Sequence, residues 1–267
     1  MPAPFVWPAI MGILNVTPDS FSDGGRYAGP EAAIAAGRQM VADGAGMIDV
    51  GGESTRPGAV PVSPAEEQAR ILTVISGLAG TVPLSVDTRN ASTMEAALDA
   101  GATVVNDVSA LTHDPDAARL VARRGCPVIL MHMRGTPETM RDLANYGDVV
   151  AEVLRELTAR VDAAVAAGVA RTQIAIDPGI GFAKALEHNV ALLRGLHMLT
   201  ELGLPVVAGV SRKRFLATLA GLVPPERSVS ASVVAALAAW EGGARTLRVH
   251  DVAETARALR VWQALRA

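Results

Sequence analysis

Hydrophobic and polar positions follow one pattern that recurs along the chain. An Ala-rich stretch with apolar residues three or four positions apart ends at a glycine, and a short run rich in β-branched residues follows. The glycine suits the left-handed residue that ends many helices, and the apolar run suits a strand buried on both faces of a parallel sheet. Seven segments show the pattern: ADGAGMIDV, LAGTVPLSVD, LDAGATVVND, ARRGCPVILMH, AAGVARTQIAID, TELGLPVVAGV and EGGARTLRVHD.

Together with IMGILNV near the start, these segments predict eight strands separated by helices. The predicted strands span residues 10–14, 47–50, 84–86, 103–106, 128–132, 174–176, 206–209 and 246–249. The clearest helix is predicted over 149–165, and its apolar face comprises Val149, Val150, Val153, Leu154, Leu157, Val161 and Val165. Asp114 is expected to cap a further helix, with Pro115 at its first position.

Eight β/α units in a chain of this length predict an α/β protein with the (β/α)8 TIM-barrel fold, in which residues 1–267 form a single domain. A doubly wound open sheet is the alternative. The barrel is favoured because the pattern gives eight strands and because no GxGxxG sequence follows the first one.

Composition narrows the possible partners. Half of the residues are hydrophobic, which suffices for one large core. The net charge of −3 and the aromatic content of 3% argue against a nucleic-acid partner, which favours basic surfaces and stacking platforms. The longest apolar run, at 233–240, is far too short to span a bilayer, so no membrane partner is expected.

Cysteine content and the N-terminal segment suggest the compartment. MPAPFVWPAI lacks a basic stretch and contains three prolines, so it is not expected to be a signal peptide. The one cysteine, Cys126, cannot form an internal disulfide or a thiolate metal cluster, and a buried inert thiol is expected there. These features suit a reducing cytosol, so we expect a cytoplasmic protein.

Polar residues gather where the predicted strands end, whereas the strand starts are small and plain. The residues at these ends are Asn15, Asp49, Glu53 to Arg56, Asp87 to Arg89, Asn106, Asp107, Met131 to Arg134, Asp177, Ser211 to Lys213, Arg248 and His250. Active sites of TIM barrels lie at the carboxyl ends of the strands, so this asymmetry favours a functional site. Taken singly, Asp49 could brace a loop, Asp107 could bind neighbouring backbone, and His132 could be a satisfied core histidine.

The chemistry of this set suits a flat heterocycle. Asp87, Asn106 and Asp177 are short acceptors or amides on rigid strand ends, and a carboxylate accepts two hydrogen bonds from an aminopyrimidine-like N–H pair. Only two of the 24 basic residues are lysines, Lys184 and Lys213. Lys213 is a slim donor suited to a ring carbonyl or nitrogen, where the planar fork of arginine would not fit.

A phosphate group is also compatible with these residues. Arg248 could stack on a ring or hold an anion, and together with His250 and Asn15 it would suit a phosphate and a hard cation. SRKRF is expected to begin a helix, whose backbone N–H groups favour an anion. The connections 15–25 and 51–64 are long for βα loops, a length typical of functional lids.

These residues lie in motifs that resemble the dihydropteroate synthase family, in the pterin-binding TIM-barrel group. The motifs are MGILNVTPDSFSDGG, DVGGESTRPG, SVDT, VNDVSAL, LMHMRGTPETM, AIDPGIGF, VSRKRF and RVHDV. They come in the family's order and span residues 11 to 252. The two long loop motifs are highly specific, whereas SVDT alone would be weak.

The resemblance implies a transferase of folate biosynthesis. In that reaction 4-aminobenzoate attacks the exocyclic methylene of 6-hydroxymethyl-7,8-dihydropterin diphosphate, pyrophosphate leaves with Mg²⁺, and 7,8-dihydropteroate forms. In this family the leaving group departs early and a carbocation-like pterin is intercepted, so no protein nucleophile is expected. The protein would position the substrates and stabilise the departing diphosphate.

The resemblance also implies roles for particular residues. The catalytic residues would be Lys213, Arg248 and His250. The pterin site would comprise Asp87, Asn106, Met131, Asp177, Lys213 and Arg248, and the 4-aminobenzoate site would comprise Thr55, Arg56, Phe182 and Ser211. Asn15 would join His250 at the diphosphate and Mg²⁺, and Asp19 would help to seal the site. Sulfonamides, as mimics of aminobenzoate, are expected in the same subsite.

Two departures from the family pattern leave an alternative open. Residues 181–184 read GFAK where the family commonly has GFGK, and RSVSASVVAA (227–236) lacks a glycine often found before its serine or threonine. Neither departure changes a residue of the implied pterin site. They are compatible with a catalytically altered pterin-binding paralogue that sequesters ligand or acts as a partner subunit.

A methyltetrahydrofolate-binding methyltransferase domain on the same scaffold is disfavoured. Such a domain would share the acidic residues of the pterin site, but it would not need residues suited to a diphosphate. This chain retains those residues: Asn15, Arg56, Lys213, Arg248 and His250. A homodimer is a further expectation from the family, with the apolar helix at 229–240 either as its interface or as ordinary barrel packing.

Overall fold

The strands predicted from the sequence pattern are present, each with boundaries within one residue of the prediction. The computed structural model describes residues 4–17, 29–54, 61–221 and 228–266. Within these ranges the strands are β1 (Ile10–Asn15), β2 (Met47–Gly51), β3 (Leu84–Asp87), β4 (Val104–Asp107), β5 (Val128–Met131), β6 (Ile174–Asp177), β7 (Val207–Ala208) and β8 (Thr246–Val249).

All of these strands run parallel in one sheet that closes on itself. The hydrogen-bonded order is β6-β5-β4-β3-β2-β1-β8-β7. A parallel bridge between Ile176 and Val206 joins β6 to the residue before β7. The fold is therefore the predicted TIM barrel and not an open, doubly wound sheet.

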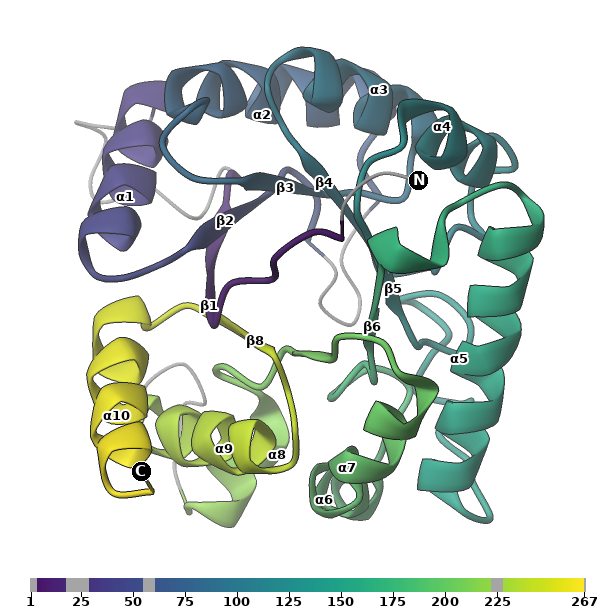
Figure 1. The fold of residues 1–267 in the computed structure, drawn as a ribbon, viewed down its shortest axis with the longest axis vertical. Helices are drawn as coiled ribbons and strands as arrows, with labels where there is room; N and C mark the ends of the chain where they lie inside the picture. The colour runs from purple at the N-terminus through teal and green to yellow at the C-terminus, as the bar shows by residue number, and fades with distance from the viewer. Residues whose placement is uncertain (1–3, 18–28, 55–60, 222–227, 267) are drawn as a thin grey trace.

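The helices surround the strands on the outside of the barrel (Figure 1). They are α1 (Pro30–Ala42), α2 (Pro64–Leu78), α3 (Ala91–Asp99), α4 (Ala117–Arg124), α5 (Val149–Ala166), α6 (Leu186–Arg194), α7 (Leu196–Leu199), α8 (Arg214–Leu219), α9 (Val229–Glu241) and α10 (Val252–Ala264). Two 3-10 turns, η1 (Arg171–Gln173) and η2 (Thr200–Leu202), precede β6 and β7. No helix in the described ranges is long and apolar enough to cross a bilayer.

The helix α5 confirms the prediction over 149–165 but corrects its apolar face. Asp148 caps the helix by accepting hydrogen bonds from the backbone N–H groups of Val150 and Ala151. Val165 was predicted on the buried face, but its side chain is 41% exposed and Ala164 faces the core instead. Steps of four residues overshoot the helical turn of 3.6 residues, so the buried face shifts by one position along the helix.

The helix start predicted at Asp114 and Pro115 is wrong by two residues. α4 begins at Ala117, and its N-cap residue is Asp116. Asp114 accepts a hydrogen bond from the N–H of Asp116 at 3.0 Å, as in an Asx turn, and its other oxygen accepts from the N–H of Ala91 at 2.9 Å. Asp114 therefore supports the first turn of the neighbouring helix α3.

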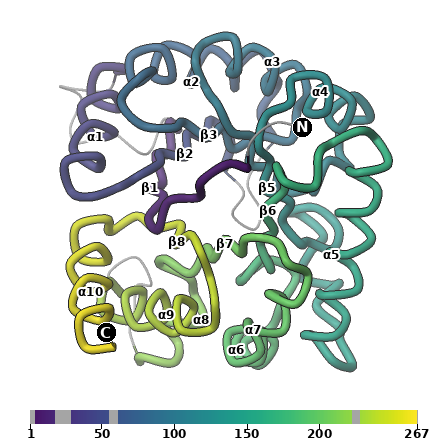
Figure 2. The backbone as a smooth tube through the Cα atoms, in the orientation of Figure 1, coloured from purple at the N-terminus to yellow at the C-terminus, as the bar shows by residue number. Residues whose placement is uncertain are grey.

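The barrel interior is filled at the end where the strands begin. One buried apolar layer comprises Met11, Met47, Val104, Ile129, Ala175 and Val207. Phe5 and Trp7 pack against this layer, edge to face with ring centroids 5.0 Å apart. Figure 2 shows the segment before β1 crossing the ring of strands. In the described part of the chain, these side chains fill the interior at this end, so a ligand would enter from the carboxyl ends of the strands.

Cys126 lies two residues before β5 and is buried and unpaired. Burial raises the pKa of its thiol to about 11, which keeps the sulfur protonated at neutral pH. The prediction of a buried, inert thiol is confirmed.

Candidate active site

Alternation along the strands brings polar side chains into the barrel above the apolar layer. Side chains two positions apart in a strand lie on the same side of the sheet. Asp49, Asn106, Met131 and Asp177 each lie two positions after a member of the apolar layer. Asp87 in β3 pairs with Asn106 in β4. Arg248 in β8 pairs with Met11 of the layer, and its long side chain reaches Asp49 and Asp87. The strand pattern thus explains why these residues meet.

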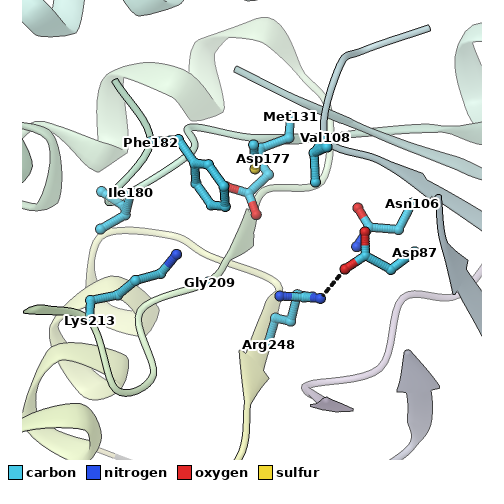
Figure 3. Close-up of a pocket in the computed structure, with 10 residues that line it drawn as sticks. All are labelled: Asp87, Asn106, Val108, Met131, Asp177, Ile180, Phe182, Gly209, Lys213 and Arg248. Atoms are coloured by element: carbon cyan, nitrogen blue, oxygen red, sulfur yellow. Dashed lines mark hydrogen bonds and ion pairs between the residues drawn. The ribbon is translucent and has the colours of Figure 1, made fainter. Parts of the chain in front are cut away.

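Seven of the predicted site residues line one pocket at this end of the barrel: Asp87, Asn106, Met131, Asp177, Phe182, Lys213 and Arg248. Figure 3 shows their side chains converging from several strands and from the connections after β6 and β7. Val108, Ile180 and Gly209 also line the pocket and were not predicted. Each follows a strand end by one to three residues, and small or apolar residues there carry no signal that distinguishes them from core.

Arg248 links two carboxylates at the base of the pocket. Its Nε donates to Oδ2 of Asp49 at 2.6 Å, and its Nη2 donates to Oδ2 of Asp87 at 2.5 Å. Oδ2 of Asp49 also accepts a hydrogen bond from Nδ2 of Asn106 at 3.1 Å. Asp49 is almost fully buried, so it orients Arg248 and Asn106 and does not brace a loop. Its one signal in the sequence was a carboxylate inside the apolar strand MIDV.

Burial governs the protonation of these groups. It raises the pKa of Asp87 to about 7, although the Arg248 guanidinium acts in the opposite direction. Burial also disfavours the charge on Arg248, but Asp49 and Asp87 outweigh it and raise the pKa of the guanidinium above its usual value. Arg248 therefore stays charged, whereas Asp87 can gain or lose a proton near neutral pH.

Asp177 is fixed by the backbone that follows it. Its Oδ1 accepts a hydrogen bond from the N–H of Gly179 at 2.7 Å. Gly179 has φ +65°, and a Cβ there would lie 1.9 Å from the carbonyl oxygen of His132, so only glycine fits. Burial raises the pKa of Asp177, while this hydrogen bond and the charge of Lys213 lower it. The carboxylate thus faces the pocket in one orientation.

Lys213 points into the pocket beside Phe182 (Figure 3). It is the N-cap residue of α8, which confirms that SRKRF begins a helix. Its Nζ lies 4.3 Å from the centroid of the Phe182 ring, a cation–π contact. Burial lowers the pKa of the ammonium to about 8, although Asp177 raises it. Lys213 is therefore a charged donor at neutral pH that loses its proton in mild alkali.

The choice of lysine at 213 follows from the space around its stem. A Cβ on Gly181 would lie 3.0 Å from Cδ of Lys213, so the stem passes close to the backbone there. A thin alkyl chain with a compact ammonium fits this passage better than a planar guanidinium.

Ser211, His250 and Asn15 lie at neighbouring strand ends, outside the lining of this pocket. Oγ of Ser211 accepts a hydrogen bond from the backbone N–H of His250 at 3.1 Å and lies 3.0 Å from Nδ1 of the same histidine. Asn15 ends β1, which pairs with β8. We call these three residues, at or just after the ends of the adjacent strands β7, β8 and β1, the second polar group.

The connection after β7 is held by Arg212. This residue has φ +56°, a left-handed conformation that is uncommon for a residue with a Cβ. Its Nη2 lies 2.6 Å from Oδ1 of Asp251, and its backbone N–H donates to Oγ of Ser232 at 2.9 Å. The ion pair joins the connections after β7 and β8 and so fixes the residues on either side of Arg212.

The donor set suits a cation that arrives with its ligand. The described part of the chain has no group of three or more His, Cys, Asp or Glu side chains that could hold a metal ion. Mg²⁺ commonly takes one or two protein oxygens and completes its shell with phosphate oxygens and water. The amide oxygen of Asn15 is such a ligand, so the residues fit Mg²⁺ carried by a diphosphate.

Two other strand-end candidates hydrogen-bond within the protein. Asp107 accepts hydrogen bonds from the backbone N–H groups of Ser109 at 2.7 Å and Leu111 at 3.0 Å. His132 is 4% exposed and lies 3.0 Å from Glu156 and 2.9 Å from Lys184. Asp107 therefore binds neighbouring backbone, and His132 is a core histidine with its hydrogen bonds satisfied. These are the simpler interpretations given from the sequence.

The predicted residues Thr55, Arg56 and Asp19 lie outside the described residues. The chain on either side of 55–60 is held by Glu53. Its Oε1 accepts from the backbone N–H of Val62 and from Nη2 of Arg89, both at 3.1 Å. The connection after β2 is therefore fastened to the connection after β3.

Comparison with known proteins gives a consistent result. Residues 11–250 match a family model described as pterin binding enzyme. The chain is 49% identical over 265 residues to dihydropteroate synthase of Neisseria meningitidis serogroup B, an alignment that covers 97% of this chain and 93% of that protein. The match therefore spans both proteins nearly from end to end.

Solved structures extend the similarity to three dimensions. A structure of Xanthomonas albilineans dihydropteroate synthase with 4-aminobenzoic acid is 50% identical, with a TM-score of 0.92, and covers 98% of this chain and 94% of that chain. A structure of dihydropteroate synthase from the same organism in complex with 7,8-dihydropteroate is 48% identical, with a TM-score of 0.88 and the same coverage. Identity at this level reaches well beyond a barrel that unrelated enzymes share.

Proposed function

This chain belongs to the dihydropteroate synthases of the pterin-binding enzyme family, and we propose that its pocket at the strand ends is the pterin site. The observation that carries the proposal is the convergence of the predicted pterin residues on one pocket. A buried aspartate, a partly buried aspartate, an asparagine, a lysine and an arginine lie there beside a methionine and a phenylalanine.

The reaction joins two substrates at a methylene carbon. The amine nitrogen of 4-aminobenzoate forms a bond to the exocyclic methylene of 6-hydroxymethyl-7,8-dihydropterin diphosphate. The bond from that carbon to the diphosphate oxygen breaks, and the nitrogen gives up one proton. Among the described residues, those that line the pocket include no serine, threonine or cysteine. This supports catalysis by positioning and charge stabilisation, with no covalent enzyme intermediate.

We assign the edge of the pterin ring to Asp87, Asn106 and Asp177. Their carboxylates and amide are held on strand ends, and each can pair with ring N–H groups or a ring carbonyl. Lys213 would donate to the ring from the facing wall, and Met131 would pack on it. Because Asp177 and Asn106 are each held by a hydrogen bond inside the protein, little side-chain freedom would be lost on binding.

We assign the diphosphate to Arg248, His250 and Asn15. Asp49 fixes Nε of Arg248, so the guanidinium is held at the pocket, and Arg248 lies two positions before His250 in the chain. Asn15 would offer its amide oxygen to Mg²⁺, and the cation would neutralise charge on the diphosphate as it departs. His250 would be oriented by its contact with Ser211. Lys213, Arg248 and His250 are therefore the proposed catalytic residues.

We assign 4-aminobenzoate to Phe182 and Ser211, together with Thr55 and Arg56. The Phe182 ring lines the pocket and offers an apolar face to the aromatic substrate. The Ser211 hydroxyl, 3.0 Å from Nδ1 of His250, could bind the substrate carboxylate. Sulfonamides should compete for this subsite.

Assembly and location are also part of the proposal. We propose a homodimer in which the outer face of α9 takes part, since Val234 on that helix is 67% exposed. Analytical ultracentrifugation of the protein and of Val234→Glu would test this. A cytoplasmic location is supported by the folate-pathway activity and by the single unpaired cysteine.

The activity is tested by pyrophosphate release from the dihydropterin diphosphate, with and without 4-aminobenzoate, in the presence of Mg²⁺. Release that depends on 4-aminobenzoate and yields 7,8-dihydropteroate is the expected result. Tight pterin binding without turnover would favour the altered paralogue instead. An absence of pterin binding would overturn the assignment of the pocket.

A further inference from the structure

Lys184, the other lysine of the chain, also lies beside the pocket. Its Nζ donates to the carbonyl oxygen of Phe182 at 2.9 Å and lies 2.9 Å from Nδ1 of His132. Lys184 is not among the residues that line the pocket. Its role therefore lies in what it holds and not in contact with a substrate.

The contact between Lys184 and His132 has a defined direction. Burial lowers the pKa of His132 to about 4, and the charge of Lys184 lowers it as well, so the imidazole is neutral under physiological conditions. Nε2 lies 3.0 Å from a carboxylate oxygen of Glu156, which can only accept, so Nε2 carries the proton. Nδ1 then presents its lone pair to the Lys184 amine, and the amine donates.

His132 is in turn part of a larger network. Glu156 accepts a hydrogen bond from Nε of Arg134 at 3.2 Å and a second, shorter one from Nη2 of the same arginine. The Arg134 guanidinium also donates to Glu152 at 2.7 Å and lies 3.9 Å from the centroid of the Tyr146 ring. These contacts anchor His132 to α5 and to the connection after β5, so Lys184 is attached to a firm support.

The segment that Lys184 fastens needs such support. Between β6 and α6 the backbone is left-handed at Gly179, Gly181 and Ala183, with φ of +65°, +85° and +48°. Ala183 carries a Cβ in a region that disfavours one, and such a backbone persists only where surrounding contacts hold it. Asn189 supports one side, since its Oδ1 accepts from the N–H of Gly181 at 2.6 Å. Lys184 supports the other side of the segment, since its Nζ donates to the carbonyl oxygen of Phe182.

We propose that Lys184 is a positioning residue of the aminobenzoate subsite, because it fastens the Phe182 backbone to His132 and so holds the Phe182 ring at the pocket. The inference rests on the proposed assignment of 4-aminobenzoate to Phe182. The same ring meets Nζ of Lys213 at 4.3 Å, so a displaced Phe182 would disturb that contact too. Burial lowers the pKa of Lys184 to about 7, but the neutral amine keeps two N–H donors, so both forms maintain the two contacts.

The test is steady-state kinetics of Lys184→Met with each substrate varied in turn. We expect the KM for 4-aminobenzoate to rise about tenfold or more, and the KM for the pterin diphosphate to change less than about threefold. Lys184→Gln, which keeps N–H donors on a shorter stem, should restore part of the loss and serves as the variant to analyse where Lys184→Met folds poorly. Arg194→Met, which removes a cation from the exposed end of α6, is the matched control and should leave both KM values unchanged.

A double-mutant cycle with Phe182→Leu separates positioning from general support of the fold. If Lys184 acts through Phe182, adding Lys184→Met to Phe182→Leu should leave the KM for 4-aminobenzoate within about twofold of the Phe182→Leu value. Additive effects, or an unchanged KM in Lys184→Met, would overturn the proposal while leaving the synthase activity intact. A wild-type protein that forms no dihydropteroate would instead remove the proposed function, and this inference with it.

Discussion

Replacing Arg248 with methionine should show how much its positive charge stabilises the carboxylates of the pocket. Arg248 is the cation between Asp49 and Asp87, and the side chains of these carboxylates are 0% and 11% exposed. Methionine keeps much of the stem but leaves both carboxylates without their cation. Removing one partner of a buried ion pair commonly costs about 3–5 kcal/mol, so the free energy of unfolding should fall by about this amount at neutral pH.

The deficit should depend on pH in a definite direction. Burial already raises the folded-state pKa of Asp87 to about 7, from an ordinary value of 3.8. A carboxyl group with a raised folded-state pKa stabilises the fold at low pH, and this contribution is lost as the pH rises through that pKa. The Arg248 guanidinium lowers the pKa of Asp87, so its removal should raise this pKa further. The loss of stability then continues above pH 7. The deficit of the variant should therefore grow above pH 7, by up to about 1.4 kcal/mol per pH unit for each proton involved.

Urea unfolding followed by circular dichroism at pH 6 and pH 8.5 measures both effects. The control is Arg245→Met, an exposed arginine directly before β8, which should stay within about 0.5 kcal/mol of wild type. Turnover of the Arg248 variant should fall by about 10²–10³, the usual effect of losing one donor at a site of developing charge. A deficit below about 1 kcal/mol, or one that is equal at the two pH values, would refute the account of Arg248 as the shared partner of two buried carboxylates.

Further predictions concern the substrates and the cation. Lys213→Ala should lower kcat/KM by about 10²–10³, and wild-type activity should decline above pH 8 as the ammonium loses its proton, which a pH–rate profile would show. Asp177→Asn should weaken pterin binding in calorimetry by about 10–150-fold, because a hydrogen bond to a charged group contributes about 1.5–3 kcal/mol. Chelation with EDTA should abolish pyrophosphate release and added Mg²⁺ should restore it, whereas turnover that persists in EDTA would contradict the role given to Asn15.

The strand positions could be predicted because each strand is short and apolar, and because a glycine precedes every strand except the first. The alternation of side chains could also have shown that Asp49 faces the interior, since Met47 and Asp49 lie two positions apart in β2. The sequence could not show its partners. Arg248 is 199 residues away from Asp49, and only barrel closure brings β8 beside β1, one strand away from β2.

The connections were harder to predict than the strands. Asp114 has the residue type of a helix cap, but tertiary contacts set its role, because the N–H of Ala91 lies within reach in the fold. Ser211 was expected beside the aminobenzoate and His250 beside the diphosphate, yet the two are hydrogen-bonded to each other. Residues on different connections meet according to loop geometry, which has no periodic signature in the sequence.

The GFAK departure shows what a sequence pattern can and cannot convey. The pattern identified position 183 as unusual, and the structure supplies the reason: Ala183 has φ +48°, where a Cβ costs about 1–2 kcal/mol and glycine costs nothing. Lys184 and Asn189 hold the segment in spite of this. Ala183 lies on the connection that carries Phe182, whereas the aspartates and the asparagine proposed to bind the pterin lie on strands. An effect of alanine at this position should therefore fall on 4-aminobenzoate and its mimics, while pterin binding keeps the properties of the family.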